Sequence, residues 1–180
     1  MRKTQRLTLL GMLAAVATLL GLIERQFVLV PAVPAIRLGL GNAALLVALY
    51  ALSAGDAWLL ALLKAVMGCL LFSGFRALPY ALCGGAAAMT AMTLLRRARF
   101  GVIGVSVGGA CAHALGQTLI SRPMLGSWAA AAQLPWLLIA SIMAGALTGA
   151  AAALTISRLP PTRGEAAFSL PTHQTRRNPS

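Results

Sequence analysis

Carboxylates are nearly absent from this sequence of 180 residues. Its three acidic side chains are Glu24, Asp56 and Glu165. General acid–base pairs and divalent-metal sites usually need carboxylates that converge on one point. Three carboxylates spread along the chain leave little scope for that chemistry. The sequence therefore predicts a protein that is not an enzyme and that carries no metal and no cofactor.

Charged residues of every kind are scarce. A soluble domain has about 25% charged and about 45–50% apolar residues, whereas this chain has 10% and 59%, with a mean hydropathy of +0.83. These charges are too few to cover a globule in water, but a surface that faces lipid needs none. The composition predicts an all-α integral membrane protein whose surroundings are the lipid bilayer.

Two common motifs are also missing. The three cysteines, Cys69, Cys83 and Cys111, lie far apart inside apolar runs. Without CxxC or Cys/His spacing they argue against a disulfide framework or a zinc site, and we interpret them as buried apolar residues. No GxxxxGK[ST] phosphate loop occurs, so the chain does not hydrolyse ATP by itself.

Apolar runs make up most of the sequence. A membrane-spanning helix needs about 20 predominantly apolar residues. Six runs approach that length: Leu7–Ile23, Leu38–Leu52, Ala57–Phe72, Leu78–Leu95, Phe100–Ile120 and Leu134–Ile156. They predict a six-transmembrane-helix domain over residues 1–156. The second and third runs are short and predict a helical hairpin, with a re-entrant second segment as the alternative.

The net charge of +12 lies at the ends of these runs. No basic stripe with interleaved aromatics occurs, which argues against nucleic acid as a partner. With six crossings, three basic clusters fall on one side, which the positive-inside rule makes cytoplasmic. The clusters are Arg2, Lys3 and Arg6; Arg96, Arg97 and Arg99; and Arg158, Arg163, Arg176 and Arg177. We expect both termini in the cytoplasm and a disordered basic cytoplasmic tail over residues 157–180.

The first apolar run has two interpretations and one notable pattern. A retained span is preferred over a cleaved signal peptide, because no clean small-x-small cleavage site follows. Small residues recur in it at four-residue spacing, in the pairs Gly11/Ala15 and Ala17/Gly21. Such pairs let helix backbones approach closely. They predict internal packing or a docking face for a second membrane protein.

Lys64 lies near the middle of the third run, in WLLALLKAVMGCLLF. A charge at that depth costs about 2.5–3.5 kcal/mol on insertion scales. One alternative is that Lys64 reaches a membrane surface or pairs with Asp56, although eight residues of helix rise about 12 Å. The preferred hypothesis places the ammonium group in a cavity, where it binds a ligand.

Three polar residues share one face of the fifth run. In GVSVGGACAHALGQTLI, Ser106 lies about 20° from His113 and about 20° from Gln117 around a helix axis. The stripe predicts either a hydrogen-bonded seam between helices or one wall of a binding pocket. We favour the pocket because Lys64 is a fourth intramembrane polar residue.

Asn42 and Arg37 stand at the start of the second run, in IRLGLGNAALL. Asn42 either caps the helix or reaches into the same cavity. Arg37 either attracts an anion or anchors the helix end at the interface. Together with Lys64, Ser106, His113 and Gln117, they predict a substrate site for a small molecule with an anionic or carbonyl-rich head and an apolar, for example prenyl-like, body.

Four stretches in order carry a family resemblance: RLGLGNAALLVALY, the span around Lys64 with GCLLFSGF, PYALCGGAAAM and GVSVGGACAHALGQ. From about Leu7 to Ile156 the chain resembles the bacterial membrane family called heptaprenyl diphosphate synthase component I or Gx transporter. That family is similar to the substrate-binding S components of energy-coupling factor (ECF) transporters. The resemblance implies a bacterial inner-membrane protein with ECF-type transmembrane and ATPase subunits as partners.

The family pattern corresponds to particular positions here. It has a basic residue at Arg37, an asparagine at Asn42 and a basic residue at Lys64. Its H-N-x-G-Q-like segment reads His113-Ala114-Leu115-Gly116-Gln117 here, so Ala114 stands where the family has an asparagine. The small residues of the first run, Gly11, Ala15, Ala17 and Gly21, resemble the face by which S components dock on their membrane partner.

Three functions follow. The preferred one is an S-component-like protein that binds a small molecule for uptake and is energised by partner subunits. The alternative is an accessory membrane subunit in heptaprenyl diphosphate synthesis. It would not be the synthase itself, because that reaction needs aspartate-rich magnesium sites and Asp56 is the only aspartate. A membrane scaffold that transports nothing is the third.

Overall fold

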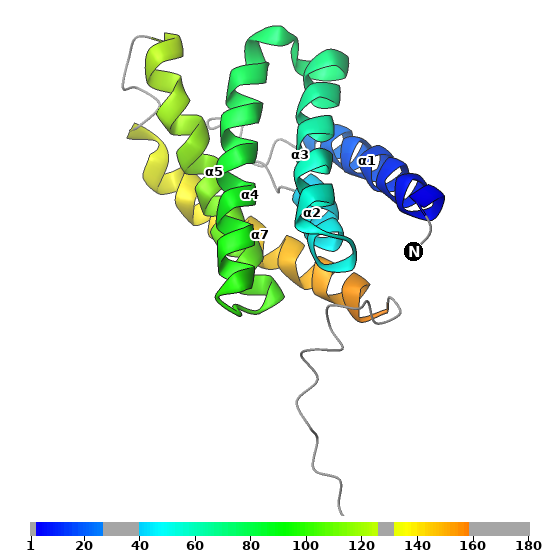
Figure 1. Cartoon of the computed structure of the whole chain (residues 1–180). Coiled ribbons are helices and arrows are strands. Elements are labelled where there is room, and N and C mark those ends of the chain that lie inside the picture. Colours follow the sequence, from blue (N-terminus) through cyan, green and yellow to red (C-terminus); the bar gives the residue numbers. More distant parts are fainter. Residues whose placement is uncertain (1–2, 27–39, 126–131, 159–180) are drawn as a thin grey trace, which may run out of the picture.

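The structure is a computed structural model that describes residues 3–26, 40–125 and 132–158. Every regular element of this part is helical (Figure 1), which confirms the predicted all-α class. The elements are α1 (Lys3–Gln26), α2 (Leu40–Ala51), α3 (Ala54–Gly68), a π-helical turn (Cys69–Ser73), a 3₁₀ turn (Phe75–Ala77), α4 (Leu78–Arg97), α5 (Val102–Leu125) and α7 (Leu134–Ser157). The predicted tail lies, from residue 159 on, outside the described residues.

Each of the six predicted runs overlaps with one α-helix, and most of the helices extend beyond the run. Within the described residues, five helical segments are long and apolar enough to cross a membrane: Thr4–Ile23, Ala54–Ser73, Phe75–Arg97, Val102–Ser121 and Leu134–Ser157. The remaining apolar helix, Gly41–Ala51, is shorter. At 1.5 Å per residue the 12 residues of α2 rise about 18 Å, less than a hydrocarbon core of about 30 Å. A sixth crossing therefore stays a prediction.

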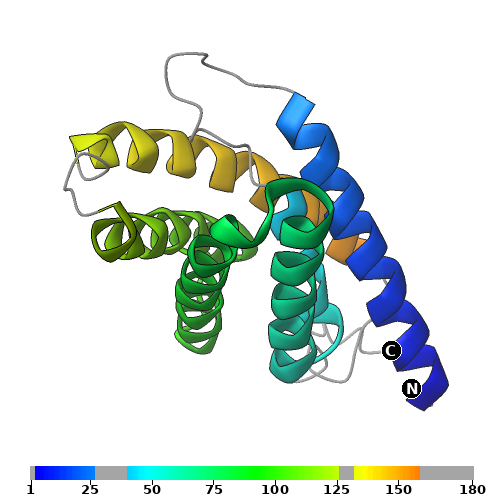
Figure 2. The ribbon, with the colours of Figure 1, turned by 90° about the horizontal axis from the view of Figure 1, so that it is seen from above.

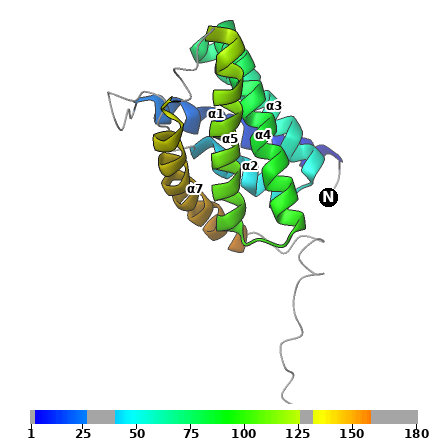
Figure 3. The same cartoon turned by 90° about the vertical axis from the view of Figure 1, so that its left-hand side faces the viewer.

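The helices form two groups that contact each other in the middle of the molecule. In the first group α5 packs along both α4 and α7, and in the second α1, α2 and α3 contact one another. Contacts of α2 with α7 and of α3 with α4 join the groups. α1 lies at the edge of the molecule away from α5 (Figures 1 and 2), and Figure 3 shows α5 between α4 and α7.

Glycines allow the closest approach within the first group. A Cβ atom on Gly145 would lie 2.8 Å from Cα of Val107, and one on Gly149 would lie 2.9 Å from Cα of Ile103. No side chain fits at such distances from a neighbouring backbone. The small-residue spacing in the last helix therefore serves packing of α7 against α5.

Two contacts tie helix ends together at one end of the bundle. Arg6 at the start of α1 forms an ion pair with Asp56 in the first turn of α3, with Nη2 2.6 Å from Oδ1 and Nε 2.9 Å from both carboxylate oxygens. Arg96 near the end of α4 donates to the backbone carbonyl of Leu49 and lies 4.7 Å from the Tyr50 ring centroid. The starts of α1 and α3 and the ends of α2 and α4 therefore share one end of the molecule.

Local sequence explains where several helices begin and end. Ser53 caps α3 by accepting a hydrogen bond from the Asp56 amide at 3.2 Å. Pro79 and Pro135 stand in the first turns of α4 and α7, where a missing amide hydrogen is tolerated. Gly74, with φ of 70°, ends the π-helical turn and lets the chain reverse into α4.

Large apolar side chains cover much of the outer surface. On α1, Leu7, Met12 and Leu19 are 71%, 62% and 58% exposed. In water such a surface would favour aggregation, whereas lipid solvates it. The exposed face supports the membrane assignment made from composition.

The four small residues predicted as a docking face divide between two sides of α1. Gly11 and Ala15 are exposed, and a Cβ on Gly11 would meet nothing within 4 Å. Ala17 is fully buried, and Gly21 lines an internal cavity. Ala17 and Gly21 therefore face the inside of the bundle, and only Gly11 and Ala15 remain available to a partner.

Candidate functional site

A cavity of about 500 Å³ lies between the two helix groups. All six long helices contribute to its wall. Its volume lies within the range of about 300–1,000 Å³ typical of small-molecule sites. The polar side chains in its wall are Thr18, Asn42, Lys64, Ser73, Tyr80, Ser106, His113, Gln117, Thr118, Ser121, Gln133, Ser141 and Thr148.

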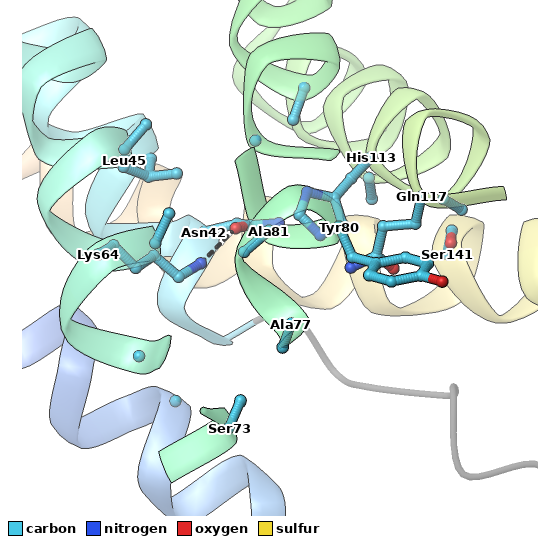
Figure 4. Close-up of a pocket in the computed structure, with 18 of the residues that line it drawn as sticks. Asn42, Leu45, Lys64, Ser73, Ala77, Tyr80, Ala81, His113, Gln117 and Ser141 are labelled. Atoms are coloured by element: carbon cyan, nitrogen blue, oxygen red, sulfur yellow. Dashed lines mark hydrogen bonds between the residues drawn. The ribbon is translucent and has the colours of Figure 1, made fainter. Parts of the chain in front are cut away.

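Lys64 reaches this cavity from α3 and contacts Asn42 of α2. Its Nζ donates to Oδ1 of Asn42 over 2.7 Å (Figure 4). Asn42 is the third residue of α2 and is 8% exposed, so it is not a helix cap and it faces the inside. The alternative that Lys64 pairs with Asp56 is wrong, because Asp56 pairs with Arg6.

Gly41 makes room for the Lys64 side chain. A Cβ at position 41 would lie 2.8 Å from Cε of Lys64, 3.0 Å from its Nζ and 3.0 Å from the carbonyl oxygen of Ala17. Three helices, α1, α2 and α3, therefore meet at this point. The absence of a side chain at Gly41 leaves space for the ammonium group beside Asn42.

His113 and Gln117 line the cavity from α5 at its other side. Figure 4 places them with Tyr80 of α4 and Ser141 of α7. A Cβ on Gly84 of α4 would lie 2.8 Å from Cγ of Gln117 and 3.0 Å from Cε1 of His113. Gly84 thus gives these two side chains their space, as Gly41 does for Lys64.

Ser106, the third member of the predicted stripe, has a different position. Its hydroxyl lies 3.2 Å from Oγ1 of Thr148 on α7, and the two residues are 1% and 2% exposed. Ser106 touches the cavity wall, but its hydroxyl belongs to the seam between α5 and α7. Each predicted alternative therefore describes part of the stripe. Ser106 contributes to a hydrogen-bonded seam between helices, and His113 and Gln117 line the cavity.

The structure brings five of the six predicted binding residues to one cavity. They are Asn42, Lys64, Ser106, His113 and Gln117. The sixth, Arg37, lies outside the described residues. Sequence reasoning missed Tyr80, Ser141 and Thr148. The spacing of Ser141 and Thr148 could have revealed them. They are seven residues apart, as Ser106 and His113 are, and residues at that spacing lie within about 20° of each other around a helix.

The charge of the cavity wall is one-sided. Among the lining residues that the structure describes, Lys64 is the only lysine or arginine, and no aspartate or glutamate accompanies it. No group of three or more His, Cys, Asp or Glu residues that could hold a metal ion occurs in the described part of the chain. The wall suits an organic anion held by an ammonium group and by neutral donors.

Comparison with known proteins gives one family match. The profile of the family "Heptaprenyl diphosphate synthase component I" matches residues 13–155, a range that reaches into every long helix from α1 to α7. No curated protein and no solved structure matches the chain. The chain belongs to the heptaprenyl diphosphate synthase component I family.

Proposed function

We propose that this protein is a membrane-embedded binding subunit, without catalytic activity of its own, that holds a small molecule with an anionic head in its central cavity. The observation that carries the proposal is the Lys64–Asn42 contact at 2.7 Å in the wall of that cavity. A lysine within an apolar helix costs about 2.5–3.5 kcal/mol. An anionic ligand beside it offsets part of that cost and explains its position.

The family match supports the role of accessory subunit in heptaprenyl diphosphate synthesis. The name "component I" implies a second component, to which we assign the catalytic chemistry. Prenyl elongation needs carboxylates that hold magnesium against the diphosphate. Asp56, the only aspartate, is engaged by Arg6 away from the cavity. The partner therefore supplies the magnesium site, and this chain contributes ligand binding in the membrane.

Uptake of the ligand is the second candidate function. It is supported by the cavity itself, which all six helices line and which is large enough to enclose a small molecule. The exposed pair Gly11 and Ala15 offers a surface for an ECF-type transmembrane subunit, with a separate ATPase as the source of energy. The family description favours the accessory role over this one.

We further propose six crossings of a bacterial inner membrane with both termini in the cytoplasm. The Arg6–Asp56 ion pair supports this topology, because it holds the starts of α1 and α3 at the same end. If α1 crosses the membrane, the chain must cross back before residue 54, and α2 is the helix in that interval. The arginines at 96, 97, 99 and 158 follow at the same end.

The test is native mass spectrometry of the detergent-purified protein. A co-purified small molecule is expected on the wild-type chain and absent from Lys64→Met. Leu62→Met is the matched control, since it places the same residue on the same helix at an exposed position. Equal occupancy of Lys64→Met and the control would overturn the site.

The two roles are separated once that molecule is identified. Energy-dependent accumulation in cells that express the chain supports uptake. A higher output of a prenyl diphosphate synthase in its presence supports the accessory role.

A further inference from the structure

Two groups of polar side chains in the cavity wall, which we call its two poles, come from different helices. One pole is the Lys64–Asn42 pair, contributed by α3 and α2. The other consists of His113 and Gln117 on α5 with Tyr80 and Ser141 beside them (Figure 4). The first pole carries an ammonium group, and the side chains of the second present hydrogen-bond donors and acceptors.

Three hydroxyl groups in the wall donate to backbone carbonyls of their own helices. The hydroxyl of Thr18 donates to the Ala14 carbonyl over 2.8 Å, that of Thr118 to the Ala114 carbonyl over 2.9 Å, and that of Ser121 to the Thr118 carbonyl over 2.6 Å. Their hydrogens are used within their own helices. These three hydroxyl groups therefore have no hydrogen left to donate to a ligand.

Small apolar residues also line the cavity, together with the larger Leu45, Phe72 and Leu137. The small residues are Ala61, Ala65, Ala81, Gly85, Ala88, Ala110, Ala114 and Ala144. Ala81 lies between Asn42 and Tyr80 in Figure 4. This lining accepts a compact apolar body and gives it no polar partner.

We propose that the ligand is bifunctional, with an anionic group at Lys64 and Asn42 and a neutral carbonyl, amide or heteroaromatic group at His113 and Gln117, joined by a short apolar part. This inference rests on the proposed function and narrows its ligand. A hydrocarbon tail placed against Gln117 would remove water from its amide group without replacing the hydrogen bonds of that water. The second pole therefore selects against a plain prenyl chain.

Matched probes test the second pole. The first series is the monoamides of linear dicarboxylic acids, from succinamate to suberamate, and the second is the plain monocarboxylates of equal chain length. Binding is measured by isothermal titration calorimetry on the full chain in lipid nanodiscs. For the chain length that fits, we expect the amide to bind about tenfold more tightly or better, because only the amide satisfies the second pole.

Variants assign the effect to each pole. In Gln117→Leu the amide should bind no more tightly than the plain carboxylate, whose affinity should stay unchanged. Lys64→Met should abolish binding of both series. His113→Leu serves as a second variant of the same pole if Gln117→Leu does not fold, and it too should reduce the amide advantage. Leu115→Met, an exposed position on α5, is the control and should leave every affinity unchanged.

The outcomes separate this inference from the function on which it rests. Equal affinities for the two series overturn the bifunctional ligand. Lys64-dependent binding of geranyl diphosphate without any amide advantage overturns it too, but leaves the binding function in place. If no probe, geranyl diphosphate included, binds in a Lys64-dependent manner, both proposals fail.

Discussion

The ammonium nitrogen of Lys64 on α3 lies 2.7 Å from Oδ1 of Asn42 on α2, and the two residues are 22 positions apart in the sequence. The acceptor is a neutral amide, so the pair as a whole keeps a charge of +1. A carboxylate at the same place would cancel that charge. The neutral amide at position 42 therefore leaves the charge of the ammonium group available to an anion, which a carboxylate there would not.

Asn42→Asp tests this relationship directly. The new carboxylate would pair with Lys64 and neutralise it, so we expect the fraction of protein that carries the co-purified molecule in native mass spectra to fall at least tenfold. The chain should still fold, because the lysine keeps a partner. Unchanged occupancy in Asn42→Asp would mean that the charge of Lys64 does not hold the ligand.

Gly84 and Gly85 offer a matched pair of substitutions on α4. Gly84→Ala should lower the free energy of unfolding by about 1–3 kcal/mol, because its Cβ would lie 2.8 Å from Cγ of Gln117. Gly85→Ala should raise it by about 0.5–1 kcal/mol, since a Cβ there meets nothing within 4 Å. Denaturant unfolding in detergent measures both, and equal effects would contradict the close packing around Gln117.

The Arg6–Asp56 ion pair should be asymmetric in its effect on stability. Asp56 is 4% exposed, whereas the Arg6 side chain is 54% exposed. Arg6→Met leaves a buried carboxylate without its arginine, so it should lower the thermal unfolding temperature more than Asp56→Asn, which leaves an arginine that water can solvate. Arg97→Met, at an exposed position, is the control. The opposite order would contradict this asymmetry.

The sequence predicted the helices well because apolar runs and basic flanks are local signals. It also placed the polar stripe of α5, because 3.6-residue periodicity relates His113 to Gln117. It did not reveal the partners of these side chains. The Lys64–Asn42 contact depends on how α2 and α3 are offset along their axes, which no local pattern in the sequence encodes. Nor did it predict that Asp56 pairs with Arg6, which is 50 residues away.

The docking face was less predictable for a similar reason. Small residues at four-residue spacing indicate close helix packing, but they do not identify the neighbouring helix. Gly11 and Ala17 lie on different sides of α1, one exposed and one buried. Only the positions of α2 and α3 distinguish them. Long-range packing therefore determines which half of the pattern faces outward.

The Ser106–Thr148 contact should contribute to stability more than to binding. Ser106→Ala, Thr148→Val and the double variant form a double-mutant cycle, for which we expect a coupling energy of about 0.6–1.7 kcal/mol, as for other hydrogen bonds between membrane helices. Occupancy by the co-purified molecule should fall less in Ser106→Ala than in Gln117→Leu. A larger loss in Ser106→Ala would return Ser106 to the binding site.

Cysteine labelling tests the number of crossings. In a background with Cys69, Cys83 and Cys111 replaced by alanine, single cysteines are placed at four exposed positions, Thr4, Arg76, Arg97 and Ser157. With six crossings and cytoplasmic termini, a membrane-impermeant maleimide should label position 76 in intact cells and the other three only after permeabilisation. If α3 and α4 each cross the membrane, for which both are long and apolar enough, the ion pair of Arg6 with Asp56 requires positions 4 and 97 to behave alike. Labelling of position 4 in intact cells, with position 97 protected, would mean that α1 and α2 do not return the chain to its starting side.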